Sequence, residues 1–116
     1  MAQVLRGDVF IANLEPRQGS EQGGTRPVVV VSRDALNKHS PVVVTCPVTK
    51  AENKTRLYPG HVKVSAGTGG LREDSIIMAE QIRAVSKTRL TNQLGKFDKT
   101  LMTSIEAVIK ITLDLP

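Results

Sequence analysis

Short apolar runs rich in β-branched residues, separated by turn formers, follow one another over the first two-thirds of the chain. Runs of this length bounded by Gly, Pro, Asn or Asp are typical of strands. We expect strands at 8–14, 28–32, 41–47 and 61–64, and either one bent strand or two short ones over 75–78 and 81–85. Pro41 and Pro47 are interpreted as the ends of the third strand. Residues 34–38 can form one helical turn.

The last part of the chain has a different periodicity. Apolar positions and one threonine recur there at the spacing of one helix face: Leu101, Ile105, Val108, Ile109 and Thr112. Asp98 is suited to cap the N-terminus, so we predict an amphipathic helix over about 99–113. Several short strands and one terminal helix favour a mainly β, α+β fold, a small curved antiparallel sheet or barrel with the helix packed on it. A length of 116 residues suits a single domain, 1–116.

The composition narrows the class of partner. A net charge of +5 favours an anionic partner. Aromatic residues make up only 3% of the chain, which argues against a surface that stacks several bases on aromatic rings.

Cys46 is the single cysteine, so it cannot form an intrachain disulfide, and we expect it to be a buried apolar side chain. No apolar run approaches the roughly 20 residues that span a bilayer, so we expect a cytoplasmic protein without a membrane partner.

A polar, glycine-rich stretch at 19–25 leads directly into Arg26 and Pro27 at the start of an apolar run. A guanidinium offers five donors in a rigid fork that matches phosphate oxygens. The stretch is no P-loop, because no lysine precedes Thr25 and the loop leads into a strand rather than a helix. The pattern therefore points toward a phosphodiester ligand.

Other polar positions leave alternatives open. His39 and His61 could form an acid–base pair for RNA cleavage, but His39 is expected on the surface, whereas His61 follows a Pro-Gly turn and can line a groove. For Glu80, structural pairing and ligand binding are equally open. Thr49 follows the third strand, where a threonine usually caps a turn. No group of residues has the spacing of metal ligands.

Taken together, these residues resemble the MazF/PemK family of bacterial toxin endoribonucleases over nearly the whole chain. The matching segments are Arg6-Gly7-Asp8-Val9, Gly19 to Val31, Ser40-Pro41, Pro47-Val48-Thr49, Gly70-Leu71 with Asp74-Ser75, Glu80-Gln81-Ile82-Arg83 and Lys87-Thr88-Arg89-Leu90. The resemblance implies an SH3-like barrel with a C-terminal helix that forms a homodimer. It also implies sequence-specific cleavage of single-stranded RNA without a metal or other cofactor, leaving 2′,3′-cyclic phosphate and 5′-hydroxyl ends.

The resemblance also implies roles for particular residues. The family's catalytic arginine falls on Arg26 and its catalytic threonine on Thr49. The residues implied to hold RNA are Ser20, Glu21, Gln22, Pro59, His61, Ser75, Glu80 and Gln81. We expect Arg26 to stabilise charge on the phosphoryl oxygens and to be able to protonate the leaving oxygen, while Thr49 orients the phosphate or the 2′-hydroxyl.

The implied partner besides RNA is a cognate antitoxin with an acidic, disordered C-terminal segment that competes for the RNA groove. Three alternatives remain at this point. A gyrase poison of the CcdB type ends in a Trp-Gly-Ile motif, whereas this chain has no Trp and ends at Leu113-Asp114-Leu115-Pro116. The others are a catalytically silent RNA- or peptide-binding relative and a structural domain whose charge is incidental.

Overall fold

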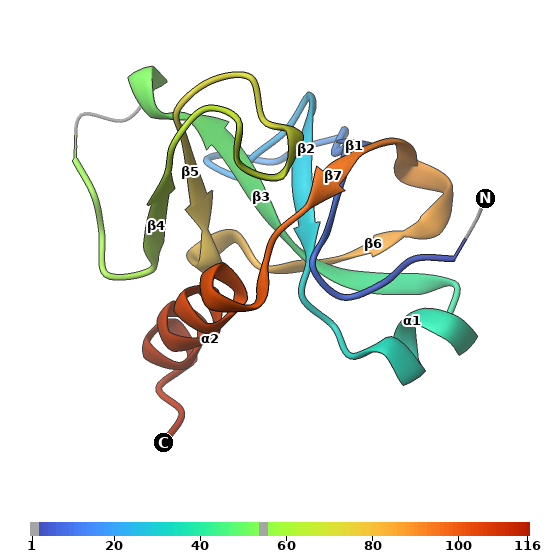
Figure 1. Cartoon of the computed structure of the whole chain (residues 1–116). Coiled ribbons are helices and arrows are strands. Elements are labelled where there is room, and N and C mark those ends of the chain that lie inside the picture. Colours follow the sequence, from blue (N-terminus) through green and yellow to red (C-terminus); the bar gives the residue numbers. More distant parts are fainter. Residues whose placement is uncertain (1–2, 54–55) are drawn as a thin grey trace.

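The computed structural model describes residues 3–53 and 56–116, and these build an antiparallel seven-stranded sheet with a helix against it (Figure 1). The strands are β1 (Asp8–Asn13), β2 (Thr25–Val30), β3 (Val42–Lys50), β4 (His61–Val64), β5 (Ser75–Met78), β6 (Arg83–Ser86) and β7 (Leu90–Lys96). Their order is β4-β5-β3-β2-β1-β7, and β6 pairs with β3. The helices are α1 (Asp34–His39) and α2 (Lys99–Leu113), and short 3₁₀ turns are at Ala51–Asn53, Thr68–Gly70, Ala79–Gln81 and Lys87–Arg89. The predicted class, an antiparallel β fold with a C-terminal helix, is confirmed.

Strand β3 joins the two parts of the sheet. Along one side it pairs with β2, and along the other it pairs first with β6 up to Thr45 and then with β5 from Val48. The prediction that Pro47 ends this strand is wrong, because β3 continues to Lys50. Position 47 lies between the residues paired to β6 and those paired to β5, so a proline there interrupts neither ladder.

The neighbouring strand β2 begins earlier than predicted. It includes Arg26 and Pro27, which pair with Ala12 and Ile11 of β1. Its pairing with β3 starts only at Val28, so the proline removes no hydrogen bond from that second ladder. The predicted start at residue 28 is therefore wrong. Arg26 lies within strand β2 rather than in the loop before it.

Two further boundaries depended on tertiary contacts. The segments 75–78 and 81–85 are two separate strands, β5 and β6, with the 3₁₀ turn Ala79–Gln81 between them. Strand β7 was not predicted. Its sequence has neither the apolar alternation nor the β-branched content that predicts a strand. In the structure, residues 91–93 are exposed and the pairing with β1 shifts register twice.

The two faces of the sheet have separate buried clusters. Val29 belongs to the cluster under α2, whereas Val28 and Val30 belong to the cluster on the opposite face. Because β2 is covered on both faces, its sequence is a continuous run of valines rather than an alternation. Helix α2 contributes Met102 and Ile105 to the first cluster.

The predicted helix start is confirmed, since the Asp98 carboxylate accepts a hydrogen bond of 2.8 Å from the Leu101 N–H. Within the described residues, neither helix combines the length and apolarity needed to cross a membrane.

Candidate active site

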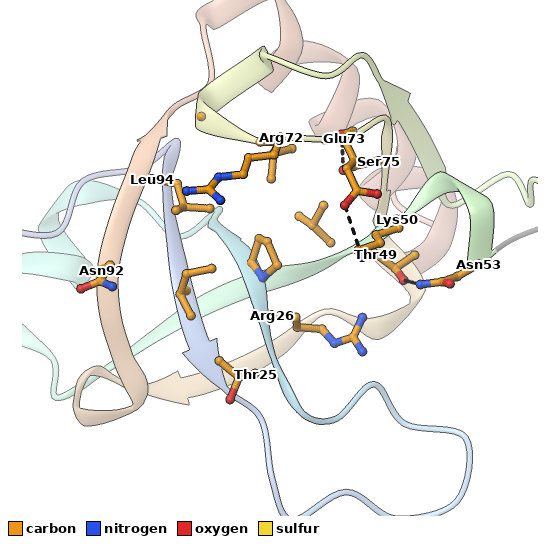
Figure 2. A pocket seen from close by; sticks show the side chains of 15 residues that line it. Thr25, Arg26, Thr49, Lys50, Asn53, Arg72, Glu73, Ser75, Asn92 and Leu94 are labelled. Carbon is orange, nitrogen blue, oxygen red and sulfur yellow. Dashed lines mark hydrogen bonds and ion pairs between the residues drawn. The ribbon is translucent and has the colours of Figure 1, made fainter.

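A pocket of about 490 Å³ opens where the β2–β3 ladder ends (Figure 2). Its walls come from β1, β2, β3, the segment before β5, and β7. The lining residues are Ile11, Thr25, Arg26, Pro27, Val48, Thr49, Lys50, Asn53, Gly70, Leu71, Arg72, Glu73, Ser75, Asn92 and Leu94. The apolar members pack on the core, so the polar side chains are presented to a partly enclosed space.

Arg26 lies on β2 at one side of this pocket. Its Nε donates a hydrogen bond of 2.7 Å to the carbonyl of Gly23, which holds the planar guanidinium against the preceding loop. Among the described residues no acceptor engages its two Nη groups. Burial, and secondarily the positive charge of Arg17, lower the pKa of Arg26, while Glu15 acts in the opposite direction. The pocket therefore contains a fixed cation with donors available to an anion.

Thr49 lines the same pocket from the adjacent strand β3, where it pairs with Ile76 of β5. The interpretation of Thr49 as a residue that caps a turn after the strand is wrong, because β3 extends through it. Its Oγ1 accepts a hydrogen bond of 3.2 Å from Asn53 Nδ2, and the residue is 5% exposed. Since a hydroxyl can donate as well as accept, the Thr49 proton stays available for a ligand oxygen.

Ser75 also lines the pocket, beside an ion pair. Its Oγ donates to the Glu73 carbonyl at 2.8 Å. The Glu73 carboxylate is 3.3 Å from Lys50 Nζ. Three of the predicted site residues, Arg26, Thr49 and Ser75, therefore share one pocket.

The predicted residues of the β1–β2 loop lie outside the lining of this pocket. Ser20 and Glu21 are exposed, and the Glu21 carboxylate accepts from the Gln18 N–H at 2.8 Å. The Gln22 N–H donates to Gln81 Oε1 at 3.3 Å, which connects the loop to the turn before β6. Two predicted residues far apart in the sequence are thus brought together.

The buried His61 pairs with the exposed Glu80 away from the pocket. The imidazole is fully buried, and its Nε2 is 2.8 Å from Glu80 Oε2. The Tyr58 N–H donates to Nδ1 at 3.2 Å. A backbone N–H can only donate, so Nδ1 is the acceptor and the proton that faces Glu80 is on Nε2. Structural pairing is thus observed for Glu80, whereas a contact of either residue, or of the exposed Pro59, with RNA stays a prediction.

The remaining sequence predictions concern isolated groups. His39 is exposed at the end of α1, as expected. Cys46 is fully buried, and burial, followed by the charge of Glu80, raises the pKa of its thiol to about 12. The thiol is therefore an apolar core group rather than a nucleophile. In residues 3–53 and 56–116, no three His, Cys, Asp or Glu side chains gather as metal ligands would.

Residues 5–113 match the family model described as PemK-like, MazF-like toxin of type II toxin-antitoxin system. The chain belongs to this family. It is 41% identical over 112 residues to the endoribonuclease EndoA of Bacillus subtilis, covering 97% of this chain and 96% of that protein. It is 43% identical over 112 residues to the endoribonuclease MazF of Staphylococcus saprophyticus, covering 97% and 92%.

Solved structures of MazF-like proteins agree with the fold. MazF from Deinococcus radiodurans superposes with a TM-score of 0.84 at 25% identity, covering 99% of this chain and all of that one. An endoribonuclease from a mycobacterial species, solved in complex with its cognate antitoxin, gives a TM-score of 0.80 at 26% identity, with 97% of both chains covered. The resemblance that the sequence motifs suggested is confirmed.

The pocket of this MazF-like chain also contains polar residues that the sequence did not single out, chiefly Lys50, Asn53, Arg72 and Asn92. Lys50 ends β3 and Asn53 belongs to the 3₁₀ turn that follows, and only the fold shows that this turn brings Asn53 back to Thr49. Arg72 precedes Glu73 in a segment that reads as a solvated turn. No local signal marks these residues, because the pocket joins segments far apart in the chain.

Proposed function

We propose that this chain is a toxin endoribonuclease of a type II toxin–antitoxin system that cuts single-stranded RNA, with mRNA as substrate, in the pocket between Arg26 and Thr49. The observation that carries the proposal is that these two residues, which the family motif nominates, line the same pocket. Membership of the MazF-like family and relatives named endoribonucleases at 41% and 43% identity support the activity. The site has the two chemical features that RNA transesterification needs, a fixed cation and a hydroxyl donor.

The proposed reaction is attack of a ribose 2′-oxygen on the adjacent phosphorus. The 2′-O–P bond forms and the P–O5′ bond breaks, which leaves a 2′,3′-cyclic phosphate and a 5′-hydroxyl. Charge accumulates on the non-bridging oxygens in the transition state, where the free Nη donors of Arg26 would stabilise it. Thr49, fixed by Asn53, would donate to one of those oxygens and hold the phosphate in line for attack.

The two proton transfers are assigned by elimination within the pocket. The 2′-hydroxyl must lose a proton and the 5′-oxygen must gain one. Arg26 is the cation beside the phosphate, and its lowered pKa makes it a better donor to the 5′-oxygen than an ordinary guanidinium. The 2′-proton passes to solvent in this proposal, since His61 is fully buried against Glu80. No metal ion or other cofactor takes part.

RNA beyond the cut would follow the β1–β2 loop and the adjoining turns. Ser75 belongs to the pocket, and the Gln22–Gln81 contact places both residues between the loop and β6. We assign RNA contacts to the residues that the family motif nominates: Ser20, Glu21, Gln22, Pro59, His61, Ser75, Glu80 and Gln81. The His61 side chain is fully buried, so its contact requires the turn at 58–60 to open, whereas Glu80 is already exposed.

The proposal includes a partner and an assembly. A cognate antitoxin with an acidic, disordered C-terminal segment would bind and compete with RNA, and a net charge of +5 suits both ligands. A mycobacterial relative solved with its cognate antitoxin supports such a partner. We propose that the chain acts as a single-domain protomer of a homodimer in the cytoplasm, where its substrate is made.

The test is incubation of the purified protein with a long mixed-sequence RNA in the presence of a chelator, beside Arg26→Ala. We expect discrete cuts at one short sequence, with 5′-hydroxyl ends that a kinase labels directly, and their loss in the variant. Equal cuts by both proteins would remove Arg26 from the mechanism. No cuts by the wild type would favour a silent RNA-binding relative or a gyrase poison.

A further inference from the structure

A second arginine, Arg72, reaches the same pocket from the segment between the turn Thr68–Gly70 and β5. Figure 2 shows its guanidinium near Leu94, on the side of the pocket away from Arg26, which lies beside Thr49 and Asn53. The two cations therefore belong to opposite walls of one opening. Neither the sequence motif nor the proposed chemistry assigns a role to Arg72.

Arg72 lacks an acidic partner within the described part of the chain, which includes every Asp and Glu. The adjacent Glu73 is engaged by Lys50 at 3.3 Å. By contrast, Arg6 pairs with Glu106 at 3.1 Å. A cationic group without a counter-ion, in a pocket that already contains Arg26, favours the binding of an anion there.

The backbone that carries Arg72 is anchored although its side chain is exposed. The preceding residue, Leu71, is 4% exposed and belongs to the core, and its N–H and C=O both bond within the turn, to Thr68 and Gly67. Gly70 has φ of +82° and packs so closely on Leu94 that a Cβ would collide with the carbonyl. A guanidinium on such a base loses little backbone entropy when it binds a ligand.

We propose that Arg72 binds a second phosphate of the RNA strand, next to the one that is cut, and so fixes the direction in which the strand crosses the pocket. The inference rests on the proposed function. Arg72 and Arg26 lie on opposite sides of the pocket, so the two arginines can engage different phosphates (Figure 2). Arg72 is thus a binding residue, outside the reacting atoms.

The experiment measures the affinity of a single-stranded RNA that contains the mapped cut site with a 2′-deoxy sugar at the cleaved position, over about 50 to 300 mM salt. Each phosphate contact on a single strand contributes about 0.7 to the slope of log K against log salt. For Arg72→Ala we expect a slope smaller by about 0.7 and affinity about tenfold weaker, because an arginine–phosphate contact is lost. Arg72→Lys should keep the slope. Arg33→Ala, an exposed arginine away from the pocket, is the matched control.

Cleavage of the unmodified RNA provides the second readout. We expect Arg72→Ala to raise KM about tenfold and to change kcat by less than about twofold. An unchanged slope and affinity in Arg72→Ala would overturn the proposal. An unchanged slope with altered preference at one base would overturn it in favour of a base contact. If the wild type cuts nothing, the proposed function fails separately, and the salt slopes with a mixed-sequence single strand still decide the role of Arg72.

Discussion

Arg26 and Thr49 occupy corresponding positions on β2 and β3, each two residues beyond the last pair of the β2–β3 ladder. The ladder ends at the pair Val28–Pro47, and the same register continued along both strands brings Arg26 opposite Thr49. From that point β2 pairs only with β1, and β3 pairs with β5, so β2 and β3 are no longer hydrogen-bonded to each other. The pocket therefore forms where two adjacent strands separate, and each strand keeps its residue fixed through its other neighbour.

Two replacements of Arg26 should distinguish the effect of its positive charge from the effect of its forked guanidinium geometry. We expect Arg26→Ala to lower the rate of RNA cleavage about 10³-fold, because the donors to the developing phosphoryl charge are lost. Arg26→Lys keeps a charge but not the fork, and we expect a loss of at least about tenfold. Single-turnover cleavage at saturating RNA measures both, with circular dichroism as the folding control. Full activity of Arg26→Lys would mean that bidentate geometry is unnecessary.

Thr49 is nearly buried, so its replacement should keep the shape of the side chain. Thr49→Val removes only the hydroxyl, and we expect cleavage to fall about 10²-fold, while Thr49→Ser keeps most activity. Asn53→Ala should have a smaller effect of about three- to tenfold, since Asn53 acts by holding the hydroxyl at 3.2 Å. Rates measured beside thermal melting curves test this order. Equal rates for Thr49→Val and wild type would exclude the hydroxyl from the reaction.

The His61–Glu80 pair should matter to stability. His61→Ala removes hydrogen bonds to Glu80 and to the Tyr58 N–H and leaves a cavity, so we expect a loss of about 2 to 4 kcal/mol. Glu80→Gln keeps an oxygen that accepts from Nε2, so its cost should be below about 1 kcal/mol. Urea unfolding of the variants tests both values. A His61→Ala protein as stable as the wild type would show that the pair contributes nothing to the turn.

Burial of the Cys46 thiol should make the free energy of unfolding depend on pH above about pH 9, the usual pKa of a thiol. Its pKa is raised from 9.0 to about 12 on folding, so between these values the folded state binds more protons than the unfolded state. The contribution of the buried thiol to stability is therefore fully present below pH 9 and decreases as the pH rises. At pH 10 the free energy of unfolding should be lower by about 1 kcal/mol. Urea unfolding at pH 8 and pH 10 measures the drop, and Cys46→Ala should reduce it by that amount. An identical drop in the variant would contradict the assignment.

The value of the sequence as a guide differed between elements. The Asp98 cap and the apolar spacing of α2 predicted that helix at its observed bounds, because a helix depends on contacts within its own segment. Strand β7 has almost no pattern of its own and exists because β1 offers it an edge to pair with. Pro47 was interpreted as a strand end, since the change of neighbours that accommodates it involves residues distant in sequence.

Some residues of the candidate site could be nominated from the sequence, and others could be identified only from the structure. The guanidinium of Arg26 beside its glycine-rich loop indicated a phosphate ligand from residue type, whereas Thr49 was nominated only by the resemblance to the family. Lys50, Asn53 and Arg72 could not be nominated, since their part in the pocket depends on which loop lies over which strand.

By itself, then, the sequence determined the strand-rich class, the terminal helix, the basic charge and the two residues at the centre of the proposed chemistry. The class, the helix and the charge follow from local propensity, periodicity and side-chain type, and the two residues follow from their place in the family motif. Only the tertiary structure decided that β2 and β3 separate beside Arg26 and Thr49, that Arg72 reaches the same pocket, and that His61 is buried against Glu80. Those facts depend on long-range strand pairing and burial, which no short stretch of the chain encodes.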